Sequence, residues 1–128
     1  MAILQIKRQE EDKMAMDSGI ATAGLRGLKG SPQKVNLVLK MIRGKDVFSA
    51  LQYLSACRKS VAKPVLKVVE SAIANAENNF DLDVDRLIVA EATVGKAFVL
   101  KRWKARARGR AGKILKPYSD VRIKLREE

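Results

Sequence analysis

One sixteen-residue segment of this chain carries a positive charge on every second residue on average. Residues 101–116 contain eight Lys or Arg side chains and no Asp or Glu. Arginine can hydrogen-bond a phosphate through two parallel N–H groups, and lysine adds a compact positive charge. The remaining residues include Ala and Gly, which are too small to build a core. Because like charges repel one another, the pattern favours binding to a polyanion and indicates nucleic acid.

We predict that the cations of this segment contact nucleic acid directly. Trp103, the only tryptophan, could stack on an unpaired base, or it could pack across the strands or against a protein. A second, weaker group surrounds a predicted helix start, where Ser31 and free amides suit a phosphate; ordinary surface lysines are the alternative there. The predicted contact residues are Lys101, Arg102, Trp103, Lys104, Arg106, Arg108, Arg110, Lys113 and Lys116, with Lys29, Ser31 and Lys34.

Several classes of chemistry are disfavoured by the residues present. The chain has no histidine, which is the commonest general base and metal ligand. Its single Cys57 cannot form an internal disulfide or a multi-cysteine zinc site. The acidic residues at 81–85 imitate the start of a calcium loop, but Arg86 and Ala92 stand where that loop needs Gly and Glu. We therefore expect no catalytic residue, no metal and no cofactor.

The net charge of +12 is distributed unevenly along the 128 residues. Residues 95–126 hold twelve of the 26 basic residues and one of the 14 acidic ones, whereas residues 64–94 hold two basic and six acidic residues. The length predicts one domain, and no apolar run approaches the roughly 20 residues of a membrane span. The first residues do not resemble a secretory signal, and one cysteine fits a reducing compartment.

The elements that would position the basic segment can be read from apolar spacing. Ile20–Leu25 reads as a short strand, and 87–94 and 121–126 also read as strands, the last with strict alternation of apolar and basic residues. Three helices are predicted between the first two strands. The first starts at Ser31-Pro32 and ends at Gly44, the second is capped by Asp46, and the third is capped by Ser60 with Pro64 in its first turn.

A strand, a basic tip with glycines and a returning strand predict a β-hairpin. Its arms from Gly95 outward lack a steady apolar face, so we expect it to project, reaching about 35 Å at roughly 3.3 Å per residue. A loop that is disordered in the free protein is the alternative. The predicted fold is α+β, with three helices packed on a small three-stranded antiparallel sheet. Residues 1–17 would form an extension and 18–128 one domain, with the projecting hairpin at about 95–118.

Three stretches together resemble a known family. They are residues 28–35 (LKGSPQKV), 69–79 (VESAIANAENN) and 106–116 (RARGRAGKILK). They are similar to the bacterial form of the uL22 family, protein twenty-two of the large ribosomal subunit. The similarity covers about residues 20–126, and the middle stretch is the most specific. One departure is Gln33, where the family pattern usually has a basic residue, so a phosphate contact there is not carried over.

The resemblance implies a structural protein that is no enzyme. It would bind large-subunit (23S) rRNA, support its assembly, and line the nascent-polypeptide exit tunnel with its hairpin. Its partners would be that rRNA, neighbouring large-subunit proteins and the nascent chain, in the cytoplasmic ribosome. The hairpin contacts would be the basic residues from Lys101 to Lys113. Two alternatives stay open: a DNA-architectural protein that inserts a basic β-arm into a minor groove, and a protein-interaction module whose arm docks on an acidic partner.

Overall fold

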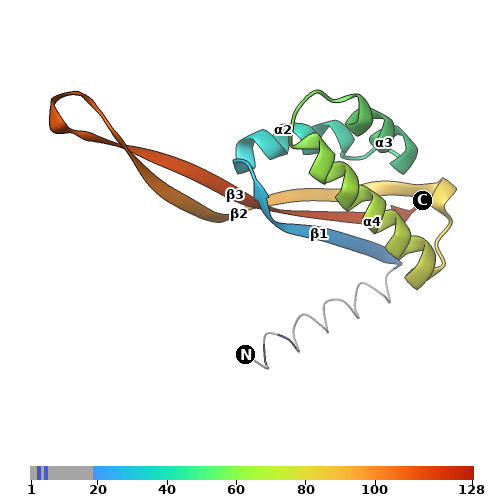
Figure 1. Ribbon diagram of the computed structural model, residues 1–128. Coiled ribbons are helices and arrows are strands. Elements are labelled where there is room, and N and C mark those ends of the chain that lie inside the picture. Colours follow the sequence, from blue (N-terminus) through green and yellow to red (C-terminus); the bar gives the residue numbers. More distant parts are fainter. Residues whose placement is uncertain (1–2, 4, 6–18) are drawn as a thin grey trace.

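The computed structural model describes residues 3, 5 and 19–128, and within 19–128 three helices cover one face of a three-stranded antiparallel sheet (Figure 1). This confirms the predicted α+β fold. The predicted extension, residues 1–17, lies outside the described residues except for Ile3 and Gln5. The elements in chain order are β1 (Ile20–Lys29), α2 (Pro32–Ile42), α3 (Val47–Ala56), α4 (Ala62–Phe80), η1 (Val84–Arg86), β2 (Leu87–Ala105), η2 (Ala107–Gly109) and β3 (Ala111–Glu127).

The last strand of the chain, β3, lies in the middle of the sheet, which has the order β1-β3-β2. The alternation of apolar and basic residues along β3 decides which of its faces is buried. Val121, Ile123 and Leu125 are at most 2% exposed and pack under the helices. The basic residues between them lie on the opposite face, because successive side chains of a strand point to opposite sides. The alternating pattern therefore predicted both the strand and its buried face.

The helices begin and end close to the predicted signals, but only one of the three predicted caps forms its side-chain bond. Asp46 occupies the N-cap position of α3, yet its side chain makes no cap hydrogen bond. Ser31 Oγ accepts a hydrogen bond from the Lys34 amide at 3.4 Å, which satisfies one free donor of α2. Helix α2 ends at Ile42, and Gly44 follows in a left-handed conformation with φ of +75°. The predicted cap at Ser60 is wrong. Helix α4 starts two residues later, because the Lys59 carbonyl accepts from the Ala62 amide and holds the intervening residues in a turn.

Strand β1 is longer than predicted because a bulge lets it continue past Leu25. The pairing register with β3 shifts between Leu25 and Leu28. Gly27 sits in this bulge with φ of +73°, a conformation that glycine adopts without strain. Its amide donates to Asp120 Oδ1 at 3.1 Å, so the bulge is fastened to the central strand.

The end of β1 marks the root of the projecting hairpin. The last β1 pair joins Lys29 to Tyr118 of β3. Just beside it, Ser119 Oγ donates to the Gly30 carbonyl at 2.7 Å, and the Gly30 amide donates to the Pro117 carbonyl at 3.2 Å. From Val99 and Pro117 outward, β2 and β3 pair only with each other. We call residues 99–117 the ribbon and the ties around Ser119 its root.

Replacing Ser119 with Ala should destabilise the domain. The Ser119 side chain is fully buried, and its loss removes the donor that the Gly30 carbonyl uses. Leaving a buried polar group unsatisfied costs about 1–3 kcal/mol. The expected result is a loss of that size in the free energy of unfolding, measured by urea denaturation of the full chain.

A matched control is Ser55→Ala on α3. The Ser55 hydroxyl also donates to a backbone carbonyl, that of Leu51, at 2.8 Å, but it is exposed. Its replacement should change the free energy of unfolding by less than about 0.5 kcal/mol, because water can replace the bond. Equal losses in the free energy of unfolding would show that the buried hydrogen bond of Ser119 stabilises the domain no more than the exposed one of Ser55.

Candidate nucleic-acid interface

The ribbon is a regular two-stranded structure that extends beyond the helices (Figure 1). Seven residue pairs, from Val99 opposite Pro117 to Ala105 opposite Ala111, span about 20 Å at roughly 3.3 Å per residue. The predicted reach of about 35 Å counted from Gly95 and was too long for the free part. Gly95 to Phe98 pair with β3 residues at the level of the root, so they do not project.

The ribbon carries its cations on both faces and at its tip. Residues opposite each other in an antiparallel pair share a face. Lys101 and Lys113 therefore lie on one face, and Arg102, Lys104 and Lys116 on the other. All eight cations from Lys101 to Lys116 are exposed. The ion pairs among the described residues join Arg86 to Glu127 and Lys124 to Glu91, so within that part of the chain no ribbon cation has an acidic partner.

The tip, Arg106–Arg110, is closed by backbone geometry. The Arg106 amide donates to the Arg110 carbonyl at 2.7 Å. Arg108 and Gly109 both have left-handed φ angles, +61° and +68°, which turn the chain back on itself. Gly112 lies under the Arg106 side chain, since a Cβ built there would be 2.9 Å from Arg106 Nε. Small residues therefore leave the tip backbone accessible and let arginine side chains cross it.

Trp103 lies on the same face as Lys113, which is directly opposite it and two pairs below the closing pair of the ribbon. Its side chain is 69% exposed. Packing across the strands, one of the two predicted alternatives, is therefore not what holds it. By contrast, Phe98 and Tyr118 at the root stack on each other with ring centroids 4.5 Å apart. The exposed indole is free to stack on a partner from outside the chain.

The second predicted group lies next to the root. Lys29 pairs with Tyr118, and Gly30 then leads into α2. Lys29 and Lys34 are exposed, but the side-chain oxygen of Ser31 is already used to cap the Lys34 amide. The structure thus places the two lysines where they extend the basic surface of the ribbon onto the body.

Sequence reasoning missed two lysines of the body. Lys63 and Lys67 stand one turn apart at the start of α4, and both are exposed beside a groove. Their spacing of four residues was the only signal available. Arg43, in contrast, is held within the fold, because its Nε donates to the Ala92 carbonyl at 2.8 Å and its Nη2 to Asn36 Oδ1 at 2.6 Å.

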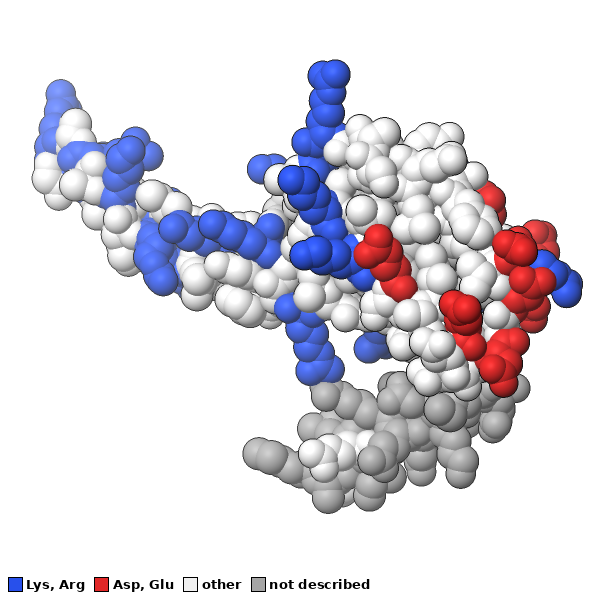
Figure 2. Space-filling view, turned by 45° about the vertical axis from the view of Figure 1, so that its right-hand side comes forward, with Lys and Arg blue, Asp and Glu red and all other residues white. Residues whose placement is uncertain are grey.

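The whole molecule is electrostatically polarised. Figure 2 shows Lys and Arg along the ribbon and at its junction with the body, whereas Asp and Glu gather at the opposite end. The acidic end includes the connection between α4 and β2, where Asp81, Asp83 and Asp85 are exposed, and the C-terminal Glu127 and Glu128. Phosphate would be attracted by one end and repelled by the other.

The described part of the chain contains neither a membrane-spanning helix nor a metal-binding cluster. No helix there is long and apolar enough to cross a membrane. No group of three His, Cys, Asp or Glu side chains there is placed to hold a metal ion. Asp83 instead uses its carboxylate to accept from the Asp85 amide at 3.1 Å.

Comparison with known proteins shows the family of this chain. The family model described as "Ribosomal protein L22p/L17e" matches residues 23–126. Among curated relatives, the protein named "Large ribosomal subunit protein uL22" of Methylorubrum populi is 58% identical over 113 residues, covering 88% of this chain and 89% of the relative. Proteins of the same name from Maricaulis maris and a Ruegeria species are each 58% identical over 107 residues, covering 84% of this chain and 85% of the relative. The chain therefore belongs to the ribosomal protein L22p/L17e family, whose members are structural and non-enzymatic.

Proposed function

We propose that this chain is a structural constituent of the large ribosomal subunit whose ribbon binds 23S rRNA and supports its assembly. Its place is the cytoplasmic ribosome. The observation that carries the proposal is the ribbon itself: eight exposed cations on two faces and a tip, without an acidic partner among the described residues. The family membership gives the ribosomal setting.

The distribution of the cations favours an environment of phosphates on all sides. A protein that rests on the surface of a duplex needs charge on one face only, but here Lys113 and Lys116 lie on opposite faces. Folded rRNA can surround a narrow ribbon with phosphates from several helices. Each lysine or arginine that neutralises a phosphate releases counterions, which drives binding. The ribbon thus fits a position inside folded rRNA.

The tip supports the further proposal that the ribbon lines the exit tunnel and meets the nascent polypeptide. Ala107 and Gly109 bring the backbone to the surface without large side chains. A tunnel wall built from such small residues is thin, and the arginines beside them keep it hydrophilic. At the opposite end, the acidic residues would disfavour RNA and suit neighbouring ribosomal proteins.

The two rival functions fit the ribbon less well. Proteins that bend DNA through the minor groove often insert an apolar wedge between base steps. The tip from Arg106 to Arg110 contains no apolar side chain larger than Ala. Trp103 projects from a face of the ribbon and not from its end, so it suits stacking better than wedging. A protein-interaction module with an acidic partner is distinguished by the binding experiment below.

Replacing Arg106, Arg108 and Arg110 together with Ala should weaken binding to 23S rRNA without unfolding the domain. All three side chains are exposed, so the free energy of unfolding should not change measurably. Each lost phosphate contact reduces the slope of log affinity against log salt by about 0.7–0.9, so the slope should become less steep by about 2. Filter binding across a salt series measures it.

The control removes three cations from the body, with Lys45, Arg86 and Lys124 changed to Ala. These side chains already contact Tyr53, Glu127 and Glu91, respectively. The control variant should keep most of the slope of log affinity against log salt. Equal losses in the two variants would contradict a specific role for the tip. Equally tight binding of the unmodified chain to random duplex DNA would favour the architectural rival, and binding to an acidic protein but not to RNA would favour the interaction module.

Trp103→Ala should weaken rRNA binding more than Leu115→Ala, which removes another exposed apolar side chain from the same face. Stacking of an aromatic ring on an unpaired base is worth about 1–3 kcal/mol, and an aliphatic side chain cannot replace it. Trp103→Phe should retain most of the affinity. Since Trp103 is the only tryptophan, its fluorescence should also be quenched on binding. Unchanged fluorescence together with unchanged affinity of the Ala variant would exclude the stacking role.

A further inference from the structure

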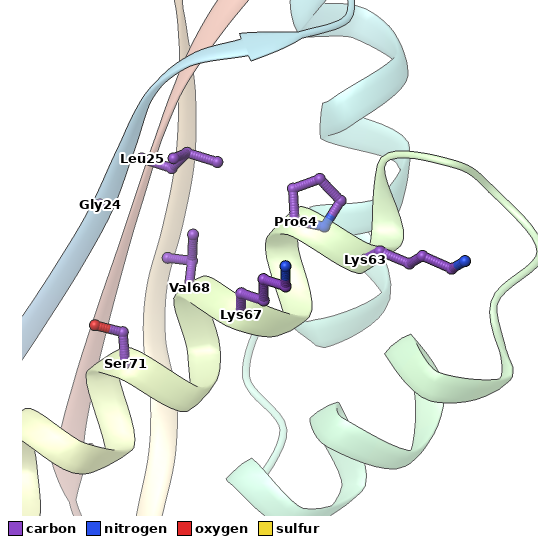
Figure 3. A pocket seen from close by; sticks show the side chains of 7 residues that line it. All are labelled: Gly24, Leu25, Lys63, Pro64, Lys67, Val68 and Ser71. Carbon is purple, nitrogen blue, oxygen red and sulfur yellow. The ribbon is translucent and has the colours of Figure 1, made fainter.

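A groove lies between β1 and the first half of α4 (Figure 3). Its volume is about 440 Å³, which falls within the roughly 300–1,000 Å³ of small-molecule clefts. Seven residues from two elements distant in sequence line it. These are Gly24 and Leu25 of β1, and Lys63, Pro64, Lys67, Val68 and Ser71 of α4.

The groove combines an apolar floor with a basic rim. Figure 3 shows the side chains of Leu25 and Val68 pointing toward each other, with the Pro64 ring on the same wall. Lys67 rises beside Pro64 at the edge of the groove, whereas the Lys63 side chain extends away from Leu25 and Val68, and no acidic residue lines the groove. Its ligand should therefore have a flat apolar part and a negative charge beside it. An unpaired nucleotide has both, in its base and its phosphate.

The position of the groove favours the same polyanion as the ribbon. Helix α4 starts with Lys63 and Lys67 and ends near Glu77 and Asp81, so its basic end lies toward the root and its acidic end lies away from it (Figure 1). An RNA strand bound at the root could continue along the basic surface of the body to this groove. Phosphates would then be held by both lysines, four residues apart on one helix face.

An extended peptide added to β1 is the competing occupant, because β1 is an edge strand. The bulge between Leu25 and Leu28 opposes it. An irregular edge pairs poorly with an added strand, and natural proteins use such bulges to prevent edge pairing.

We propose that this groove binds one unpaired rRNA nucleotide, with its base between Leu25, Pro64 and Val68 and its flanking phosphates on Lys63 and Lys67. The inference rests on the proposed rRNA-binding function and adds a second, body-borne contact to the ribbon. It makes the groove a point where the protein reads the single-stranded character of the RNA, since a base in a duplex is not free to enter.

The test is a methyl NMR titration of the full chain with single-stranded hexaadenylate, and with a short RNA duplex for comparison. The expected result is an upfield ring-current shift of the Leu25 and Val68 methyl signals with the single strand and none with the duplex. Lys63→Gln with Lys67→Gln should make the salt slope of hexaadenylate binding less steep by about 1.4, for two lost contacts at about 0.7 each. Ser71→Phe, at an exposed position, should block the methyl shifts with the lysines intact.

The matched control is Lys45→Gln with Lys124→Gln, which removes the same charge from positions outside the groove and should preserve the methyl shifts. If the Trp103 indole signal shifts on RNA binding but the Leu25 and Val68 methyls do not, the groove proposal is overturned and the ribbon function stands. If none of these signals shifts, the groove proposal and the proposed RNA-binding function of the ribbon are both overturned. Larger methyl shifts with a Glu-Val repeat peptide than with hexaadenylate would overturn the nucleotide in favour of a peptide.

Discussion

The ribbon can project because hydrogen bonds at its root, made without any of its cations, hold a segment whose own charges repel one another. An isolated two-stranded hairpin is marginally stable in water, and eight cations make it less so. At the root, Ser119 donates to Gly30 from a fully buried position and Asp120 accepts from Gly27. Because β3 pairs with both neighbours there, the ribbon continues the central strand of the sheet and inherits its direction. The ribbon is thus fixed by hydrogen bonds that involve none of its eight cations.

This arrangement separates stability from affinity. The buried side chains, among them Leu39, Ile42 and Leu87, all lie in the body, and fully burying each contributes about 1.5–3 kcal/mol. The ribbon cations contribute nothing to that core and are therefore free to serve a partner. The acidic end completes the separation, because a molecule with opposite charges at its two ends is oriented by the field of a polyanion before contact.

The sequence predicted those features that depend on local periodicity. Alternation at 121–126 predicted a half-buried strand, Ser31-Pro32 predicted a helix start, and the apolar spacing predicted three helices. The central place of β3 was not predictable, because periodicity gives a strand its buried face but does not choose its neighbours. The Ser60 cap failed because a competing turn from Lys59 to Ala62 was not visible in the pattern. The groove was missed for a similar reason: Leu25 and Val68 are brought together only by the packing of α4 on the sheet.

The exposed aromatic near the tip is the clearest sign that the ribbon is incomplete alone. Leu100 and Ile114, next to the cations, are half-buried and give the paired strands some apolar contact, which offsets part of the repulsion. Trp103 gains nothing of this kind, with 69% of its surface in water. Leaving so large an apolar side chain exposed forfeits burial that the fold could have used. A partner that supplies both flat apolar rings and dense negative charge would recover it, and single-stranded segments of folded RNA are such a partner.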